Sequence, residues 1–245
     1  MPVVPRAQEP PMPTITAHRG SSAAAPENTL AAFRQAIRDR ADGAELDVHQ
    51  AADGTLVVTH DVHLARVAGV DANIWELTGE ELGRLDVGSH FARAFRGEPL
   101  PTLEQVIELV RGHLRLNVEL KKHGHESGYA VGVIETLRSL RFANACVVTA
   151  RDVELLREVR RAAPELVIGL ILEDLTDDVM RHDVDLFSVH RAIASTAFVD
   201  EARDLDRAVH VWTVDDPADM VQFATYGVND LITNVPRLAR EVLGE

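Results

Sequence analysis

Two carboxylates stand two residues apart in a short apolar stretch, residues 43–48, that is typical of a buried strand. Side chains at positions i and i+2 of a strand point to the same face, so Glu45 and Asp47 project together. Two like charges held side by side either raise a pKa or share a cation, and a hard divalent ion with oxygen ligands removes the repulsion. Spacing alone is equally compatible with a surface strand that carries a solvated acidic face.

The same spacing recurs in residues 116–121, where Glu119 and Lys121 share one face of another predicted strand. Together with Glu45 and Asp47, the carboxylate of Glu119 can hold one Mg²⁺ or Ca²⁺, with water and substrate oxygens in the remaining positions. The ammonium group of Lys121 supplies positive charge for an anionic group bound to that ion.

Two histidines follow other predicted strands. His18 and Arg19 come directly after residues 14–17, and His60 comes after residues 55–59. Two histidines on different strands can flank a cation as general base and general acid, which together with a second positive charge from Arg19 suits phosphoryl transfer from an ester. Each of these residues alone fits a structural role, but their recurrence at strand ends favours one shared site.

The scaffold that gathers strand ends in this way is a (β/α)₈ TIM barrel, and the chain alternates predicted strands and helices over its whole length. A doubly wound open sheet is the alternative, although the sequence has no Gly-x-Gly-x-x-Gly or Walker-type loop. The predicted strands are residues 14–17, 43–48, 114–120, 146–150, 166–172, 185–189, 209–214 and 230–233. The predicted helices include residues 30–37, 102–110, 153–162, 197–206 and 218–226.

One long segment interrupts the alternation. Residues 55–59 form an extra predicted strand that returns beside the strand of the acidic pair. Residues of about 64–100 are irregular and polar, with one short predicted helix at 78–85, and we interpret them as an inserted cap. The proline-rich residues 1–13 predict a disordered tail, which leaves residues 14–245 as a single barrel domain.

Composition narrows the function classes. The formal net charge of −14 argues against nucleic acid or an anionic membrane surface as partner, whereas an anionic small substrate stays compatible with a metal site. No apolar run reaches the roughly 18 residues of a membrane span, and no signal peptide is evident, so we expect a cytoplasmic protein without stable membrane insertion. Cys146 is the single cysteine and is predicted to lie in the core.

An ordered set of short motifs resembles the glycerophosphodiester phosphodiesterase family. Each string is weak alone, but the set runs in the family's order across nearly the whole chain after residue 13. The matching strings are His18-Arg19-Gly20, Pro26-Glu27-Asn28-Thr29, Glu45-Leu46-Asp47-Val48, Asp53-Gly54, His60-Asp61, Pro101-Thr102-Leu103-Glu104, Glu119-Leu120-Lys121 and Trp212-Thr213-Val214.

The resemblance implies a TIM barrel with a small insertion after His60-Asp61 and hydrolysis of glycerophosphodiesters to glycerol 3-phosphate and an alcohol. It leaves open whether water attacks directly or a glycerol hydroxyl first forms a cyclic phosphate. A homodimer is compatible with it. The implied roles are a metal site of Glu45, Asp47 and Glu119, an acid–base pair of His18 and His60, phosphate contacts from Arg19 and Lys121, and a pocket wall formed by Trp212.

Two rival functions use the same residues. Phospholipase D-like cleavage of lysophospholipids would need room for an acyl chain beside Trp212. A non-catalytic barrel that binds a phosphate ligand would need no acid–base pair, so the presence of both His18 and His60 weighs against it.

A few further residues depart from the family pattern or lie near the expected site. Asn234 stands where the family usually has Asp, and we expect little effect on the chemistry. Ala150 stands where many members have Ser.

His123 and His125 follow Lys121 in a loop that we expect to be solvated, rather than part of a second metal or substrate site. His190 and Glu173 end predicted strands and are equally compatible with pocket and surface positions.

Overall fold

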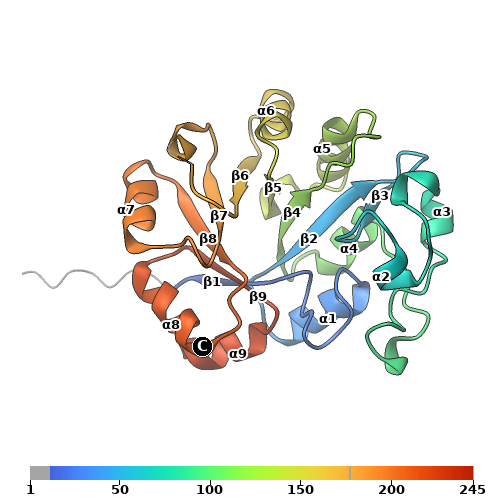
Figure 1. The fold of residues 1–245 in the computed structure, drawn as a ribbon, viewed down its shortest axis with the longest axis horizontal. Coiled ribbons are helices and arrows are strands. Elements are labelled where there is room, and N and C mark those ends of the chain that lie inside the picture. Colours follow the sequence, from blue (N-terminus) through green and yellow to red (C-terminus); the bar gives the residue numbers. More distant parts are fainter. Residues whose placement is uncertain (1–11, 177, 245) are drawn as a thin grey trace, which may run out of the picture.

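The computed structural model describes residues 12–176 and 178–244 and shows a closed barrel of eight parallel strands with helices between them (Figure 1). The first and last barrel strands, β1 and β9, pair with each other, and β1 also pairs with β2, which closes the sheet. The barrel strands are β1 (Thr14–Ala17), β2 (Gly43–Gln50), β4 (Arg115–Leu120), β5 (Cys146–Ala150), β6 (Val167–Leu172), β7 (Leu186–His190), β8 (Ala208–Trp212) and β9 (Asp230–Thr233).

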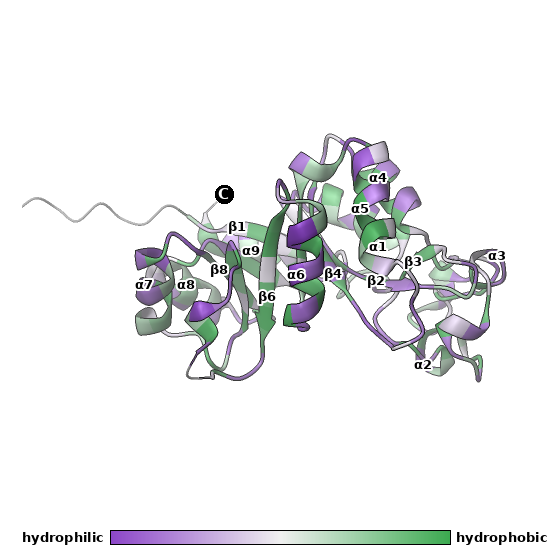
Figure 2. Cartoon of the chain, turned by 90° about the horizontal axis from the view of Figure 1, so that it is seen from above, coloured by the Kyte–Doolittle hydropathy of each residue, from purple (hydrophilic) through white to green (hydrophobic). Residues whose placement is uncertain are grey.

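Helices surround the barrel and turn an apolar face toward it. In Figure 2, β6 is hydrophobic along most of its length, whereas α6 also shows hydrophilic residues. This pattern is typical of a buried strand covered by an amphipathic helix. The helices between barrel strands are α1 (Leu30–Arg38), α4 (Leu103–Val110), α5 (Tyr129–Ser139), α6 (Val153–Ala162), α7 (Thr196–Asp204) and α8 (Pro217–Tyr226), and α9 (Pro236–Leu243) follows the last strand.

The helices begin where the sequence supplies a capping side chain. Thr29 accepts a hydrogen bond from the backbone N–H of Ala32 at the start of α1, and Asp152 does the same for the first turn of α6. At the start of α4, Thr102 and Gln105 form a reciprocal capping box. These caps fix where each strand-to-helix loop ends.

The inserted cap is confirmed as an irregular segment beside β2 and β3, to one side of the barrel in both views (Figures 1 and 2). Strand β3 (Leu56–Val58) pairs antiparallel with the extension of β2, as predicted. A second small core joins the cap to the β2–β3 hairpin and is formed by Ala51, Val57, Leu64, Val67, Ile74, Leu82, Val87 and Leu100.

The prediction of a helix over residues 78–85 is wrong in extent. Only α3 (Gly79–Leu82) forms, behind a capping box made by Thr78 and Glu81, and the other regular pieces of the cap are α2 (Ala65–Ala68) and two short 3₁₀ turns. Leu82 is the buried residue of α3, so the segment lacks the apolar stripe that would support a longer helix. Most other predicted bounds differ from the observed ones by one or two residues.

Cys146 is buried among core residues, which confirms its prediction. The tail predicted for residues 1–13 lies outside the described residues except for Met12 and Pro13. None of the described helices has the length and apolar character that a membrane span requires.

Candidate functional site

Strand register brings the three predicted carboxylates together. In the parallel pair β2–β4, Asp47 lies directly beside Glu119, and Glu45 lies two residues away on the same face. One oxygen from each of the three side chains lies within 4.8 Å of the others. All three residues are buried, with Asp47 only 1% exposed. Three buried carboxylates this close together require compensating positive charge.

Burial and mutual repulsion shape the ionisation of this cluster. Burial, followed by the charges of Asp47 and Glu119, raises the pKa of the Glu45 carboxyl well above its ordinary value. Burial and Asp47 also raise the pKa of Glu119, against the opposing effect of Lys121. Burial alone would raise the pKa of Asp47 too, but Lys121 and Arg19 outweigh it and the pKa is lowered.

The same residues fit a divalent cation. Among the described residues, Asp47 Oδ1 and Glu119 Oε1 are buried oxygens that accept no well-formed hydrogen bond, although Lys121 Nζ lies 3.1 and 2.9 Å from them. Three oxygen donors of this kind are the ligand chemistry that Mg²⁺ and Ca²⁺ prefer. A divalent ion would also relieve the repulsion that raises the pKa of Glu45.

His18 follows β1 and is oriented by residues from the far end of the chain. Its Nδ1 lies 2.8 Å from Oδ1 of Asn234. The Asn234 amide nitrogen donates to Asp215 at 2.6 Å, which fixes Oδ1 as the acceptor toward His18. His18 therefore carries its proton on Nδ1, and its Nε2, 4.0 Å from Glu45, faces the carboxylate cluster. Burial, and then the nearby Arg19, lowers the pKa of His18 and favours the neutral ring.

His60 is oriented by a neighbouring carboxylate. His60 Nδ1 lies 2.6 Å from Asp61 Oδ1, and the other oxygen of Asp61 accepts a hydrogen bond from Arg66 Nε at 2.5 Å. Burial would raise the pKa of Asp61, but the hydrogen bonds from Arg66 and His60 lower it to about 2. Asp61 is thus ionised at neutral pH. Because this carboxylate engages Nδ1 of His60, Nε2 is the nitrogen left for chemistry.

A chain of ion pairs joins this histidine to the phosphate-binding candidates. Arg66, from α2 of the cap, also holds Glu27 with two hydrogen bonds of 2.7 and 3.1 Å. Glu27 in turn accepts from Arg19 Nη1 at 3.1 Å, and Arg19 Nε lies 3.4 Å from Asp47. The network therefore runs from the cap to the carboxylate cluster.

The backbone around Arg19 is specialised. Arg19 adopts a positive φ of 55°, and its N–H donates to Glu45 Oε2 at 2.9 Å. Gly20 follows with a φ of 77°, and a Cβ there would lie 2.7 Å from Ala32 of α1. Only glycine tolerates both the conformation and the close approach, which explains the residue after His18-Arg19.

A small hollow of about 40 Å³ at the carboxyl end of the barrel joins these groups. Trp212 lines it, and its Nε1 donates to the carbonyl of Ser188 at 3.1 Å. His190 packs against the Trp212 ring with 5.1 Å between centroids, so it supports the wall. The predicted site residues that line the hollow are His18, Arg19, Glu45, His60, Glu119, Lys121 and Trp212, while Asp47 lies behind them in the carboxylate cluster.

Sequence reasoning missed Arg151, which also lines the hollow. It follows β5 directly, so the strand-end rule could have found it beside Ala150. The sequence also gave no sign that Asn234, for which we expected little effect on the chemistry, would orient His18, because that contact depends on barrel closure between β1 and β9.

The expectation of a solvated loop is wrong for His123. Its side chain is only 2% exposed and lies between His49 and Trp75, with centroid distances of 5.8 and 4.9 Å. Trp75 also stacks on His125 at 4.3 Å. These rings fasten the loop after β4 to the cap, because aromatic packing outweighs the polarity of the loop sequence.

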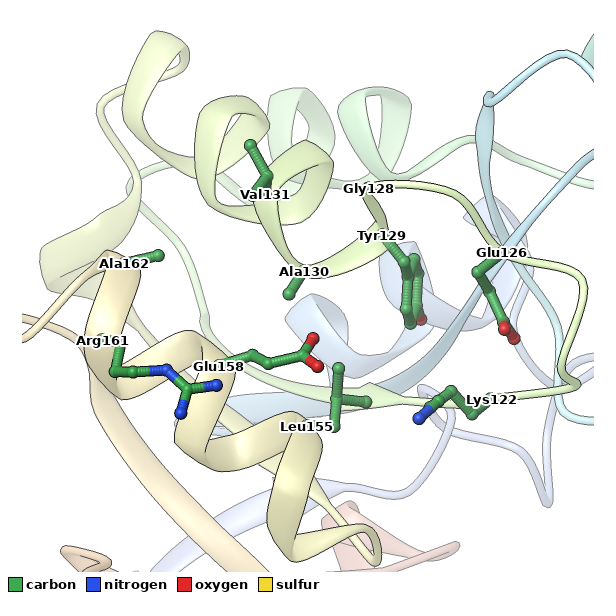
Figure 3. A pocket seen from close by; sticks show the side chains of 10 residues that line it. All are labelled: Lys122, Glu126, Gly128, Tyr129, Ala130, Val131, Leu155, Glu158, Arg161 and Ala162. Carbon is green, nitrogen blue, oxygen red and sulfur yellow. The ribbon is translucent and has the colours of Figure 1, made fainter.

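A separate hollow of about 550 Å³ lies outside the barrel between α5 and α6 (Figure 3). Glu158 extends from α6 between Ala130 and Leu155, with Arg161 on one side of it and Lys122 and Glu126 on the other. Lys122, at its edge, pairs with Asp152 at 3.1 Å. The charged groups here do not converge, in contrast to those at the barrel mouth.

The chain is similar to several known proteins over most of its length. A glycerophosphodiester phosphodiesterase from Caldanaerobacter subterraneus is 33% identical over 91% of this chain and 94% of its own. A phosphodiesterase structure from Oleispira antarctica, in complex with the product sn-glycerol-3-phosphate, superposes with a TM-score of 0.90 at 25% identity, covering 96% of this chain and 98% of that one.

A structure from Silicibacter pomeroyi, described as a glycerophosphoryl diester phosphodiesterase, gives a TM-score of 0.87 at 27% identity over 95% of this chain and 93% of that one. The model of one protein family matches residues 18–238, from the first histidine of the site to α9. The chain therefore belongs to the glycerophosphoryl diester phosphodiesterase family.

Proposed function

We propose that the chain hydrolyses glycerophosphodiesters to glycerol 3-phosphate and an alcohol, with a divalent cation bound by Glu45, Asp47 and Glu119. The observation that carries the proposal is the convergence of three buried carboxylates from β2 and β4 beside a hollow that His18 and His60 also line. As a member of its family the protein is a phosphoric diester hydrolase. The product in the Oleispira antarctica structure is the one proposed for this chain.

Each charged group has a distinct task in this proposal. The cation, Mg²⁺ or Ca²⁺, polarises the phosphoryl group when bound. Lys121 and Arg19 bring positive charge to the phosphate oxygens, on which negative charge accumulates during transfer. Trp212 forms the wall against which an organic part of the substrate packs.

We infer opposite roles for the two histidines from the charge of their Nδ1 partners, a neutral amide oxygen for His18 and a carboxylate for His60. His18 holds its proton on Nδ1 toward Asn234, so Nε2 has the free lone pair of a general base that activates the nucleophile. His60 is held through Nδ1 by Asp61, so Nε2 is the nitrogen that delivers a proton to the leaving oxygen. The nucleophile is water or a neighbouring glycerol hydroxyl.

The test compares glycerophosphocholine with lysophosphatidylcholine, each with Mg²⁺, with Ca²⁺ or with a chelator, and identifies the phosphorylated product. We expect glycerol 3-phosphate from glycerophosphocholine when a divalent ion is present. Turnover of lysophosphatidylcholine alone would favour the phospholipase D-like alternative. Binding of either compound without turnover under any condition would favour the non-catalytic barrel and contradict the proposal.

A further inference from the structure

One wall of the barrel mouth carries an ion pair placed against an aromatic face. Arg151 follows β5 and Glu173 follows β6, and Arg151 Nη1 lies 2.8 Å from Glu173 Oε1. The Arg151 guanidinium also lies over the ring of Trp212, 5.4 Å from its centroid. The wall therefore combines an aromatic face and a carboxylate with a guanidinium that contacts both.

Arg151 also reaches the edge of the carboxylate cluster. Its Nε lies 3.8 Å from Glu119 Oε1, and its side chain is 44% exposed at the mouth of the hollow. A group attached to a phosphate held near Glu119 and extending toward Trp212 would lie beside this guanidinium. Arg151 is thus placed to contact the part of a substrate that extends from the phosphate toward Trp212.

We propose that Arg151 and Glu173 set the alcohol specificity, so that the site prefers hydroxyl-rich or anionic alcohols over quaternary ammonium alcohols. The inference rests on the proposed hydrolysis of glycerophosphodiesters. An exposed aromatic face beside a carboxylate would attract a quaternary ammonium group. Here Arg151 covers that face and neutralises that carboxylate, so a second cation meets charge repulsion.

The chemistry of the guanidinium explains why hydroxyl-rich or anionic alcohols are preferred. It has five N–H donors and no acceptor, and Glu173 takes only one side of it. The remaining donors suit the hydroxyl groups of a polyol or the oxygens of an anionic group. Because the ion pair with Glu173 is exposed, it is weak enough for such a group to share Arg151.

The test measures kcat/KM for glycerophosphoinositol and glycerophosphocholine at saturating divalent metal. We expect the wild-type protein to favour glycerophosphoinositol. Arg151→Gln removes the charge and should raise the choline-to-inositol ratio of kcat/KM about tenfold, since it exposes Trp212 and Glu173 to the ammonium group. In the double variant Arg151→Gln/Glu173→Gln, most of that gain should disappear because the carboxylate is gone.

Arg138→Gln is the matched control. Arg138 forms a similarly exposed pair with Glu165 at 2.6 Å on α5, so its loss should leave the ratio unchanged. Arg151→Lys keeps the positive charge and should stay close to the wild-type ratio.

A wild-type preference for glycerophosphocholine would overturn the inference, and so would equal losses on both substrates in Arg151→Gln, which would place Arg151 on the shared phosphate. If the wild-type protein cleaves glycerophosphodiesters and Arg151→Gln leaves the choline-to-inositol ratio of kcat/KM unchanged, the inference fails but the proposed function stands. If it cleaves no diester, the proposed function fails and the inference falls with it.

Discussion

Asp47 is the residue on which most of the candidate site converges. Its Oδ2 accepts a hydrogen bond from Asn28 at 2.8 Å, and Lys121 and Arg19 approach it from two other sides. Asn28 reaches it from a backbone with a φ of 57°, a conformation that Asn tolerates better than most residues. Asp47 thus contributes to both structure and electrostatics, whereas Glu45 accepts a hydrogen bond from the backbone N–H of Arg19.

At Glu45 we predict a loss of metal affinity. Glu45→Ala removes one of three oxygen donors, so the affinity for Mg²⁺ or Ca²⁺ should fall more than about 100-fold, which exceeds the usual cost of losing an outer-shell partner. Isothermal titration calorimetry measures the affinity directly, with His60→Ala as a control that keeps all three carboxylates. Unchanged affinity in Glu45→Ala would refute this assignment.

At the histidines we predict a loss of turnover without a loss of metal. His18→Ala and His60→Ala should each lower kcat by about 10²- to 10⁴-fold, the usual contribution of a general acid or base. His63→Ala is the matched control, because His63 pairs with Asp71 on the cap surface and should leave kcat unchanged. Wild-type turnover in either of the first two variants would remove that histidine from the mechanism.

At the scale of elements, the cap helix α2 acts on the site through one side chain. Arg66 bridges Asp61 and Glu27, and these two carboxylates orient His60 and Arg19 respectively. A four-residue helix has little stability of its own, and Val67 anchors it in the small core of the cap. The cap therefore contributes to the geometry of both catalytic and phosphate-binding candidates.

We predict that Arg66→Ala lowers kcat about tenfold, a smaller effect than loss of a catalytic group, while metal affinity stays unchanged. Arg66→Lys should restore little, because an ammonium group cannot reproduce the two-pronged contact with Glu27. Steady-state kinetics and calorimetry together test this. A kcat equal to that of the wild-type protein would show that His60 needs no help from the cap.

The ion pair between Asp61 and Arg66 predicts a pH effect on the stability of the folded protein. The pKa of Asp61 is about 2 in the folded protein and about 3.9 in an unfolded chain. Its stabilising effect is therefore complete above pH 4 and is lost as the pH falls toward 2. Because the pair is partly exposed, we expect the contribution to be below about 1 kcal/mol. Urea unfolding at pH 7 and pH 2.5 should show a smaller difference for Arg66→Ala than for wild-type protein.

At the scale of the whole molecule, the barrel encloses a core that protects the single cysteine. Burial raises the pKa of the Cys146 thiol to about 12. The folded protein should therefore resist a thiol reagent at pH 8, and one thiol should react on unfolding in guanidinium chloride. Rapid stoichiometric labelling of the folded protein would contradict the burial of β5.

The sequence predicted the arrangement of residues that follow a local period, but not the contacts that depend on barrel closure or on the irregular cap. Period-two spacing was sufficient to place Glu45 with Asp47, and Glu119 with Lys121, on inward faces. The contact of Asn234 with His18 spans the barrel closure, and that of Arg66 with Asp61 depends on an irregular cap. Neither follows a local period, so the sequence could not reveal them. The homodimer and the cytoplasmic location stay predictions.

The most direct test of the central claim is metal restoration followed by phosphorus NMR. The protein is dialysed against a chelator, mixed with glycerophosphocholine, and then supplied with Mg²⁺ or Ca²⁺. The account predicts no change in the diester resonance before the metal is added, and growth of the glycerol 3-phosphate resonance afterwards. Formation of glycerol 3-phosphate at the same rate in the presence of chelator would contradict the account.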